Sequence, residues 1–465
     1  MKHAFVKIST VVVALSASAA IAGTGTPVVS SCTMQQGPGN RIVTIKYAFE
    51  DNTVPAVVTL DVKTNVTGSV TANESDWVSI GGEHLWNAQG AVWRKVTSAD
   101  IGGDGKFTIT WDPTQTWKDD EGNGFKVNAS RVDVTAWPFD NTPDYMVVDL
   151  TASGGPDTQR YYSSTNFLPG GLLANEDYRK NLLVMRKIMA KDVRWTMGNL
   201  GNTGASAGHV VQLTNNYYIG VFEFTQSQWA KVATNSVTAA YYTADKLMRP
   251  MERVTFNELR NTHRTSAMTA TVEANDNALT AGAGGVWPDA PTSDSFLGLL
   301  RLKTGLDFDL PSDAEWEFAC RAGNGEQKWN NGLPYSVSSS ADVNLSLLAR
   351  YRRGNPAAGD SKSTTLAPTE GGTAICGSYA PNSWGLYDMH GNVGELCLDF
   401  YSSDPSVLAA LQGKVNTTTA TTRVRRGGAL NGEYYDCYSS TKASADSRGI
   451  RYFQGFRVVC RAGLD

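Results

Sequence analysis

The chain has 465 residues, with 41 Lys and Arg against 45 Asp and Glu and a formal net charge of −4. Charges of both signs are scattered along the sequence, so composition gives no electrostatic case for nucleic-acid binding. A chain of this length exceeds one ordinary hydrophobic core, and two domains are therefore expected. Charged residues make up only 18%, while Gly, Trp and Tyr are plentiful, which is typical of loop-rich secreted proteins.

Residues 1–22 have the pattern of a cleaved signal peptide. Lys2 and Lys7 give a positive start, and an apolar run then ends at Ala20-Ile21-Ala22, an A-x-A cleavage site. The run is shorter than the roughly 20 residues that a membrane span needs, although a short membrane anchor is the alternative. We expect a secreted, periplasmic or cell-surface protein, with no membrane span in the mature chain and a composition that fits a bacterial source.

A polar lead-in over 23–38 precedes a first domain at 39–152, which we expect to be an immunoglobulin-like β-sandwich. Short alternating runs rich in Val, Thr, Ile and aromatic residues predict its strands. The runs are 41–49, 56–64, 91–96, 106–111, 131–137 and 145–151. The domain holds no catalytic constellation, and we interpret it as an adhesive or spacer module, with a carbohydrate-binding module as the alternative.

A Gly/Ser-rich connector over 153–183 leads to a second domain at 184–462, in which short strands, a few helices and long loops alternate. Residues 215–232 predict a strand that runs into a helix, with Thr225 as N-cap and Gln228 completing a capping box. Residues 304–323 predict a helix that begins after Pro311 with an acidic first turn. The segment 264–300, rich in Ala, Thr, Gly and Asp, is expected to be a surface excursion.

Several motifs of the second domain, taken in order, resemble the formylglycine-generating enzyme (sulfatase-modifying factor) family. The matches are Met197-Gly198; Ile219, Gly220, Glu223, Thr225, Gln228 and Trp229; Pro250 and Val254; DLPSDAEWEFACRAG at 309–323; PNSWGLYDMHGNVGEL at 381–396; RVRRGGAL at 423–430; and Gly455-Phe456-Arg457. The resemblance implies an α+β, C-type-lectin-like fold with little regular secondary structure, preceded here by the all-β sandwich.

Active members of that family use oxygen and a copper(I) ion held by two cysteine thiolates to convert a sulfatase cysteine to formylglycine. Thiolate is the soft ligand that Cu(I) selects. The first cysteine position of the family falls on Gly432, and the second falls on Cys437. Three positions of the substrate groove fall on Leu396, Ala429 and Lys442, where the family has Trp, Ser and Arg. The catalytic set is therefore incomplete.

The six cysteines of an exported chain indicate disulfides. For Cys437 the alternative to copper is a disulfide with Cys397, and a second pairing of Cys320 with Cys460 is expected to join a helix to the last strand.

The resemblance also implies structural calcium. Glu395 would bind it together with the carbonyls of His390, Gly391 and Val393, in an all-oxygen site that suits a hard cation. A second calcium would use Asn344. The alternative for Glu395 is a buried ion pair with an arginine of 423–426.

We therefore expect a non-catalytic binding or scaffold member of the family, with a protein or glycan ligand. The alternative is a copper-dependent formylglycine-generating oxidase acting on a sulfatase. An iron-dependent member is disfavoured because the histidines at 84, 209, 263 and 390 lack the spacing of a facial site.

Overall fold

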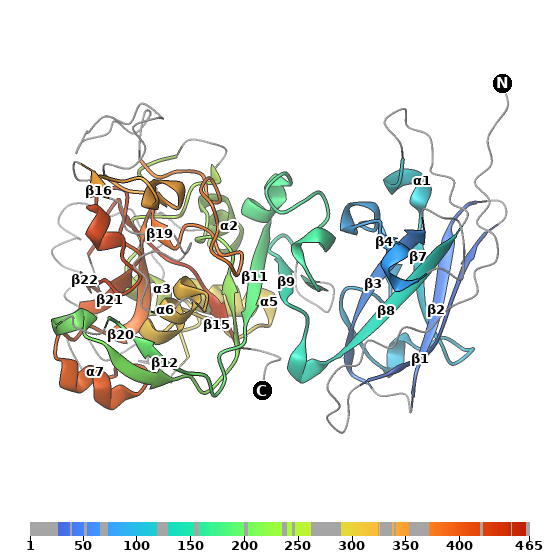
Figure 1. Ribbon diagram of the computed structural model, residues 1–465, viewed down its shortest axis with the longest axis horizontal. Coiled ribbons are helices and arrows are strands. Elements are labelled where there is room, and N and C mark those ends of the chain that lie inside the picture. Colours follow the sequence, from blue (N-terminus) through green and yellow to red (C-terminus); the bar gives the residue numbers. More distant parts are fainter. Residues whose placement is uncertain are drawn as a thin grey trace. The chain divides into compact units, whose positions relative to one another are not determined.

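The chain forms two compact units in a computed structural model (Figure 1). Unit 1 comprises Met1–Val147 and Gln159–Asn175, and unit 2 comprises Val148–Thr158 and Glu176–Gly463. The structure describes residues 27–37, 40–50, 54–65, 73–118, 129–152, 158–199, 203–234, 240–243, 247–261, 290–323, 325, 337–338, 341–352, 372–418, 422–447 and 449–461. The expected signal peptide at 1–22 lies outside these residues.

Unit 1 is built from two antiparallel sheets. One has the order β1-β2-β7-β5, and in the other β3 pairs with β4, β6 and β8. The strands are β1 (Val29–Gln36), β2 (Val43–Phe49), β3 (Ala56–Asn65), β4 (Trp77–Ser79), β5 (Gln89–Gly90), β6 (Lys95–Val96), β7 (Phe107–Trp111) and β8 (Ser130–Pro138), with the short helix α1 (Pro113–Thr116).

Side-chain alternation explains the first of these sheets. Every second residue of β2 is buried, as a period of two requires, and its Tyr47 stacks on Phe107 with ring centroids 5.1 Å apart. The strand-rich character predicted for this region is confirmed. Two details differ from the prediction. Strand β1 lies within the lead-in expected at 23–38, and the strand expected over 91–96 is shortened to β6. The immunoglobulin-like arrangement stays a prediction.

The described part of unit 2 combines two larger sheets and three two-stranded sheets, β12-β13, β16-β17 and β18-β19, with several helices. In one sheet β11, β14, β24 and β15 are neighbours in that order, and the other has the order β22-β21-β20-β23. Strands β9 (Tyr145–Asp149) and β10 (Gln159–Tyr162) lie where the division between the units crosses the chain. The strands of unit 2 are β11 (Leu182–Ile188), β12 (Arg194–Met197), β13 (His209–Gln212), β14 (Tyr217–Gly220), β15 (Phe308–Asp309), β16 (Val337–Ser338), β17 (Ala341–Asp342), β18 (Ala349–Arg350), β19 (His390–Gly391), β20 (Gly394–Phe400), β21 (Thr422–Arg426), β22 (Lys442–Asp446), β23 (Gln454–Gly455) and β24 (Val459–Cys460). The helices are α2 (Gln226–Val232), α3 (Phe256–Arg260), α5 (Phe296–Thr304), α6 (Asp313–Arg321) and α7 (Pro405–Leu411).

Capping boxes begin the two helices that the sequence predicts best. The Thr225 side chain accepts from the backbone of Gln228 at the start of α2, and Ser312 accepts from Glu315 at the start of α6. Each box satisfies backbone N–H groups that a helix end leaves without partners. All nine residues of α6 are buried, so this helix lies inside unit 2 and brings its charged residues into the core.

The expected connector and one expected loop contain regular secondary structure. The connector 153–183 includes β10 and the first residues of β11, and its residues belong partly to unit 1 and partly to unit 2, so the expected domain bounds stay a prediction. The expected surface excursion 264–300 ends in α5, whose Phe296, Leu297 and Leu300 are fully buried. Among the described residues, no helix is long and apolar enough to cross a membrane.

Candidate functional site

The three residues expected in a substrate groove lie in the interior of unit 2. Leu396 on β20 is fully buried, and Ala429 and Lys442 are 5% and 7% exposed. The Lys442 ammonium lies 2.7 Å from Asp313 of α6, and Arg426 of β21 lies 2.5 Å from the other oxygen of the same carboxylate. The structure therefore places a buried ion cluster, rather than an open groove, at these positions.

This cluster pairs two carboxylates with three cations. Burial alone would raise the pKa of Asp313, but Arg426 and Lys442 hold it below the ordinary value. Arg426 also lies 2.9 Å from Glu317, which in turn pairs with Arg321. Removing one partner of such an ion pair is costly, because the other charge is then left buried without compensation. The cluster serves the packing of α6 against β21 and β22.

Cys437, the one cysteine that falls on a copper position, is fully buried. Its side chain packs with Leu345, Leu348 and Tyr351, and burial raises the pKa of the thiol. A Cβ atom added at Gly428 would lie 2.5 Å from the Cys437 sulfur, so the backbone closes over the thiol. The first copper position, Gly432, has no side chain to offer. These donors do not fit a Cu(I) ion held by two thiolates.

All six cysteines are buried and none of them forms a disulfide, so neither expected disulfide is present in the structure. Cys397 packs in a cluster around Trp316 and Met389, whereas Cys437 packs in a separate cluster around Leu345. The expected pairing of Cys397 with Cys437 is wrong for this arrangement because the two side chains fill different cores. The pairing of Cys320 with Cys460 is likewise absent.

Glu395 has partners other than calcium. Its two carboxylate oxygens accept hydrogen bonds from Arg457, each at 2.7 Å, and one also accepts from the Trp316 indole at 2.6 Å. A cation at Glu395 would face the Arg457 guanidinium, and the arrangement does not fit calcium there. The alternative of a buried ion pair is correct in kind, but its arginine lies outside 423–426.

The other residues expected to bind calcium also have structural roles. The His390 ring donates from Nδ1 to the Cys437 carbonyl at 2.7 Å, and burial lowers the pKa of the ring to about 4. Gly391 and Val393 donate their N–H groups to the carbonyl of Gly427 and the carboxylate of Glu223. The N–H of Asn344 donates to Asp342. These contacts do not involve the expected carbonyl oxygens, so calcium binding by those carbonyls and by Asn344 stays a prediction.

A second buried cluster was missed by sequence reasoning. Glu223, Cys376 and Asp388 come from three separate segments, and each offers a ligand atom within 4.8 Å of the other two. Burial, and then the neighbouring Asp388, raises the pKa of Glu223. Burial also raises the pKa of Asp388 to about 6 and that of the Cys376 thiol well above its ordinary value. Glu223 and Asp388 lie in recognised motifs, but only the fold brings Cys376 to them.

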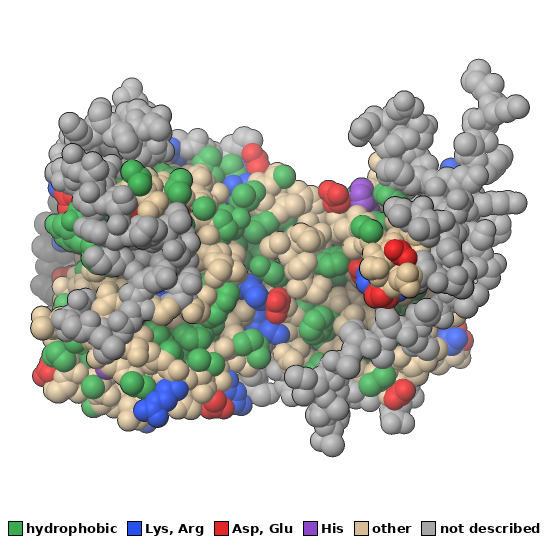
Figure 2. Space-filling view, viewed as in Figure 1, with side chains coloured by type: hydrophobic (Ala, Val, Ile, Leu, Met, Phe, Trp, Pro, Cys, Tyr) green, Lys and Arg blue, Asp and Glu red, His purple; other side chains and the backbone are tan. Residues whose placement is uncertain are grey.

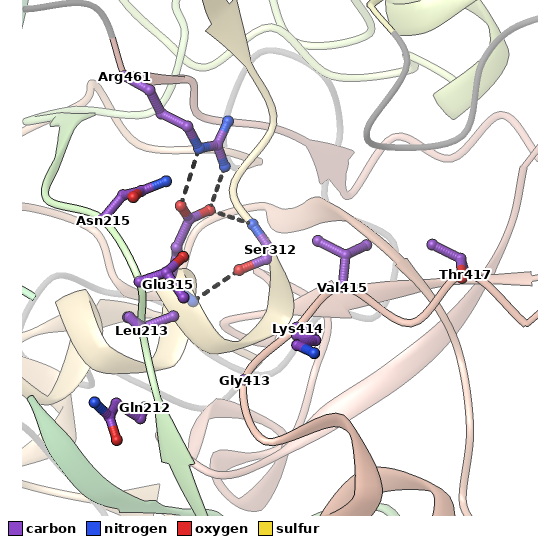
Figure 3. A pocket seen from close by; sticks show the side chains of 11 residues that line it. Gln212, Leu213, Asn215, Ser312, Glu315, Gly413, Lys414, Val415, Thr417 and Arg461 are labelled. Atoms are coloured by element: carbon purple, nitrogen blue, oxygen red, sulfur yellow. Dashed lines mark hydrogen bonds and ion pairs between the residues drawn. The ribbon is translucent and has the colours of Figure 1, made fainter. Parts of the chain in front are cut away.

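A pocket of about 240 Å³ opens between the segment after β13, the start of α6 and the segment after α7 (Figure 3). Arg461 lies over it and donates to both carboxylate oxygens of Glu315, which also accepts from the Ser312 N–H. Asn215 and Lys414 add polar groups to the wall. Because Glu315 already accepts from three donors, its carboxylate is not available as a general base.

An aromatic surface lies over the cluster that contains Cys437. We define it as Tyr434, Tyr435 and Tyr438 together with Leu347. Tyr434 and Tyr438 pack on the buried cluster, while Tyr435 and Leu347 are 50% and 55% exposed. Tyrosine supplies large contact area at low conformational entropy cost and is enriched in binding interfaces.

On the face drawn in Figure 2, acidic and basic side chains of the described residues are interspersed.

Comparison with known proteins places these features in context. The family model for the sulfatase-modifying factor enzyme 1-like domain matches residues 152–462. The chaperone protein LppX of Paenibacillus barcinonensis is 26% identical over 250 residues, which cover 53% of this chain and 80% of that protein. The formylglycine-generating enzyme of Thermomonospora curvata is 29% identical over 126 residues, covering 26% of this chain and 38% of the enzyme. The enzyme of Mus musculus is 31% identical over 133 residues, covering 28% and 31%. The chain thus spans less than half the length of these two enzymes.

Two solved structures are also similar. Treponema denticola variable protein 1 has a TM-score of 0.41 at 20% identity, covering 60% of this chain and 95% of that one. PvdO from Pseudomonas aeruginosa has a TM-score of 0.43 at 16% identity, covering 60% and 94%.

Proposed function

We propose that this chain, which belongs to the sulfatase-modifying factor enzyme 1-like family, is an exported, non-catalytic binding or scaffold member with a protein or glycan ligand. The observation that carries the proposal is the pair of positions where the copper cysteines would stand. One is Gly432, and the other is a buried thiol at Cys437 whose pKa is raised.

The chemistry of copper binding explains why this observation matters. The thiolate, not the thiol, is the metal ligand, and burial disfavours the thiolate of Cys437. Loading copper there would require both deprotonation and opening of the packing under Gly428. Even then only one sulfur would be available, since Gly432 adds none.

The groove positions support the same conclusion. Lys442 is paired with Asp313, and Leu396 is enclosed in the core. A peptide substrate could reach Lys442 only by disrupting its ion pair with Asp313, and Leu396 only by opening the core. The residues that a relative would use for substrate binding therefore stabilise the fold here.

The aromatic surface is the face that we propose for ligand binding. Its exposed Tyr435 and Leu347 stand on a well-packed base, so little ordering is needed when a partner binds. One relative is named a chaperone protein, and that name indicates binding of another protein rather than an oxidation reaction. That relative supports a protein ligand over a glycan.

The test is a copper(I) titration of the purified full chain, followed by competition with a chelator of known affinity. We expect no tight site that depends on Cys437, so wild type and the Cys437→Ser variant should give the same curve. A stoichiometric site that disappears in Cys437→Ser would overturn the proposal. It would favour the alternative function, a formylglycine-generating oxidase that acts on a sulfatase.

A further inference from the structure

The cluster of Glu223, Cys376 and Asp388 has the composition of a metal site. All three residues are buried, and each offers a ligand atom within 4.8 Å of the others. The Cys376 sulfur lies 3.7 Å from Oε2 of Glu223. Ligand atoms in a tetrahedral zinc site are about 3.5 Å apart, given metal–sulfur and metal–oxygen distances of roughly 2.3 and 2.0 Å.

The hydrogen bonds around the cluster orient the two carboxylates and leave acceptor capacity directed inward. Glu223 accepts from the Val393 N–H at 3.0 Å on Oε1, and on Oε2 it accepts from the Asn392 amide at 2.6 Å and from the Cys376 thiol at 3.7 Å. Each carboxylate oxygen has a second lone pair. Partners of this kind fix the direction of metal ligands in known sites.

Asp388 provides an independent observation. Its Oδ2 accepts from the Gly377 N–H at 2.7 Å, but its Oδ1 is buried and has no hydrogen-bond partner. The residue is only 2% exposed. A buried carboxylate oxygen without a donor is costly unless a cation or an additional donor faces it, and this one belongs to a carboxylate that lies within 4.8 Å of a thiol and a second carboxylate.

A divalent cation would balance the charges of the cluster once the Cys376 thiol gives up its proton. Arg457 lies beside the cluster and forms an ion pair with Glu395, so those two charges cancel. Arg179 donates to the Cys376 carbonyl and is the other arginine near Asp388. The Cys376 thiol donates to Glu223, and a bound metal would take the place of that proton. The two carboxylates and the sulfur would then carry three negative charges. Arg179 and a divalent ion together neutralise them.

We infer that Glu223, Cys376 and Asp388 form a binding site for one divalent transition metal of the zinc class. The thiolate selects such an ion over calcium or magnesium, whose ligands are oxygens. The ion would join the segment after β14, the turn that contains Cys376 and the loop before β19. Because the site is enclosed, the ion would be taken up as unit 2 folds, and its role would be structural.

The experiment measures metal content and affinity in the full chain, refolded with zinc or cobalt(II) and then freed of loose ions by dialysis. We expect one zinc per chain. Cobalt(II) should give thiolate-to-cobalt charge-transfer absorption in the near ultraviolet. Cys376→Ser and Asp388→Asn should weaken binding at least about 100-fold, since changing even an outer-shell partner costs about 10–100-fold. Cys397→Ser, at another buried cysteine of unit 2, is the matched control and should bind as wild type does.

Three outcomes would overturn the inference. Wild type could bind neither ion, which would mean that protons alone compensate the negative charge of the cluster. Cobalt(II) could bind without charge-transfer absorption, which would exclude the thiolate. Cys376→Ser could keep wild-type affinity, which would place the metal elsewhere. If Cys376→Ser does not fold, the cobalt spectrum of wild type and the affinity of Asp388→Asn decide.

Discussion

Replacing Arg457 with methionine should destabilise unit 2 strongly. The Arg457 guanidinium donates to both oxygens of Glu395 and also to the carbonyls of Gly220 and Tyr387. Methionine keeps the apolar stem but leaves a fully buried carboxylate and two carbonyls without these donors.

The magnitude follows from the burial of the pair, whose side chains are at most 1% exposed. Removing one partner of a buried ion pair costs about 3–5 kcal/mol. For a domain of this size, a loss of that order lowers the melting temperature by roughly 10 °C. The double variant Arg457→Met, Glu395→Gln should recover part of the loss, because it no longer buries an uncompensated charge.

Scanning calorimetry of the full chain is the assay, with a chelator present. The transition that includes unit 2 should move to lower temperature. The exposed Arg451→Met is the matched variant and should melt within about 0.5 kcal/mol of wild type, as surface substitutions usually do. If Arg457→Met melts like Arg451→Met, the reasoning about this ion pair is refuted.

Three further outcomes are expected. Burial lowers the pKa of His390 to about 4, so the unfolded chain takes up its proton first as the pH falls below the ordinary value of about 6.5. The free energy of unfolding of wild type should therefore fall by up to about 3 kcal/mol more than that of His390→Gln between those pH values, as measured by urea unfolding. An equal dependence of this free energy on pH in the two proteins would contradict the expectation. Thr225→Ala removes the N-cap of α2 and a hydrogen bond to the Arg179 carbonyl, which should cost about 1–2 kcal/mol in the same assay, whereas an unchanged midpoint would show that the cap contributes nothing. Millimolar calcium should leave the melting temperature unchanged because the Glu395 carboxylate is paired with Arg457. A rise in melting temperature that disappears in Glu395→Gln would show that calcium binds at Glu395.

Local signals in the sequence predicted local structure well. The capping box at Thr225 and the helix after Pro311 form as expected because their determinants lie within four residues of one another. The alternating run of β2 forms a strand for the same reason. Helix α5 was missed because the polar composition of the segment before it dominated the interpretation, although Phe296, Leu297 and Leu300 provide an apolar face.

Long-range partners could not be read from the sequence. Arg457 rather than an arginine of 423–426 pairs with Glu395, and Arg423 instead stacks on Phe256 and Phe400, its guanidinium 3.9 and 3.5 Å from the two ring centroids. Similarly, Cys376 lies 153 residues from Glu223 in the chain. No local pattern encodes either approach, because both depend on the path of the backbone through unit 2.

The most direct test of the non-catalytic proposal is turnover of a Cys-x-Pro-x-Arg peptide by the full chain with copper(I), a reductant and oxygen, followed by mass spectrometry. A copper-dependent member of the family, run in parallel, confirms that the conditions support the reaction. With Gly432 at one copper position and a buried thiol at the other, the peptide cysteine should remain unmodified. Conversion of that cysteine to formylglycine, lost in Cys437→Ser, would contradict the account.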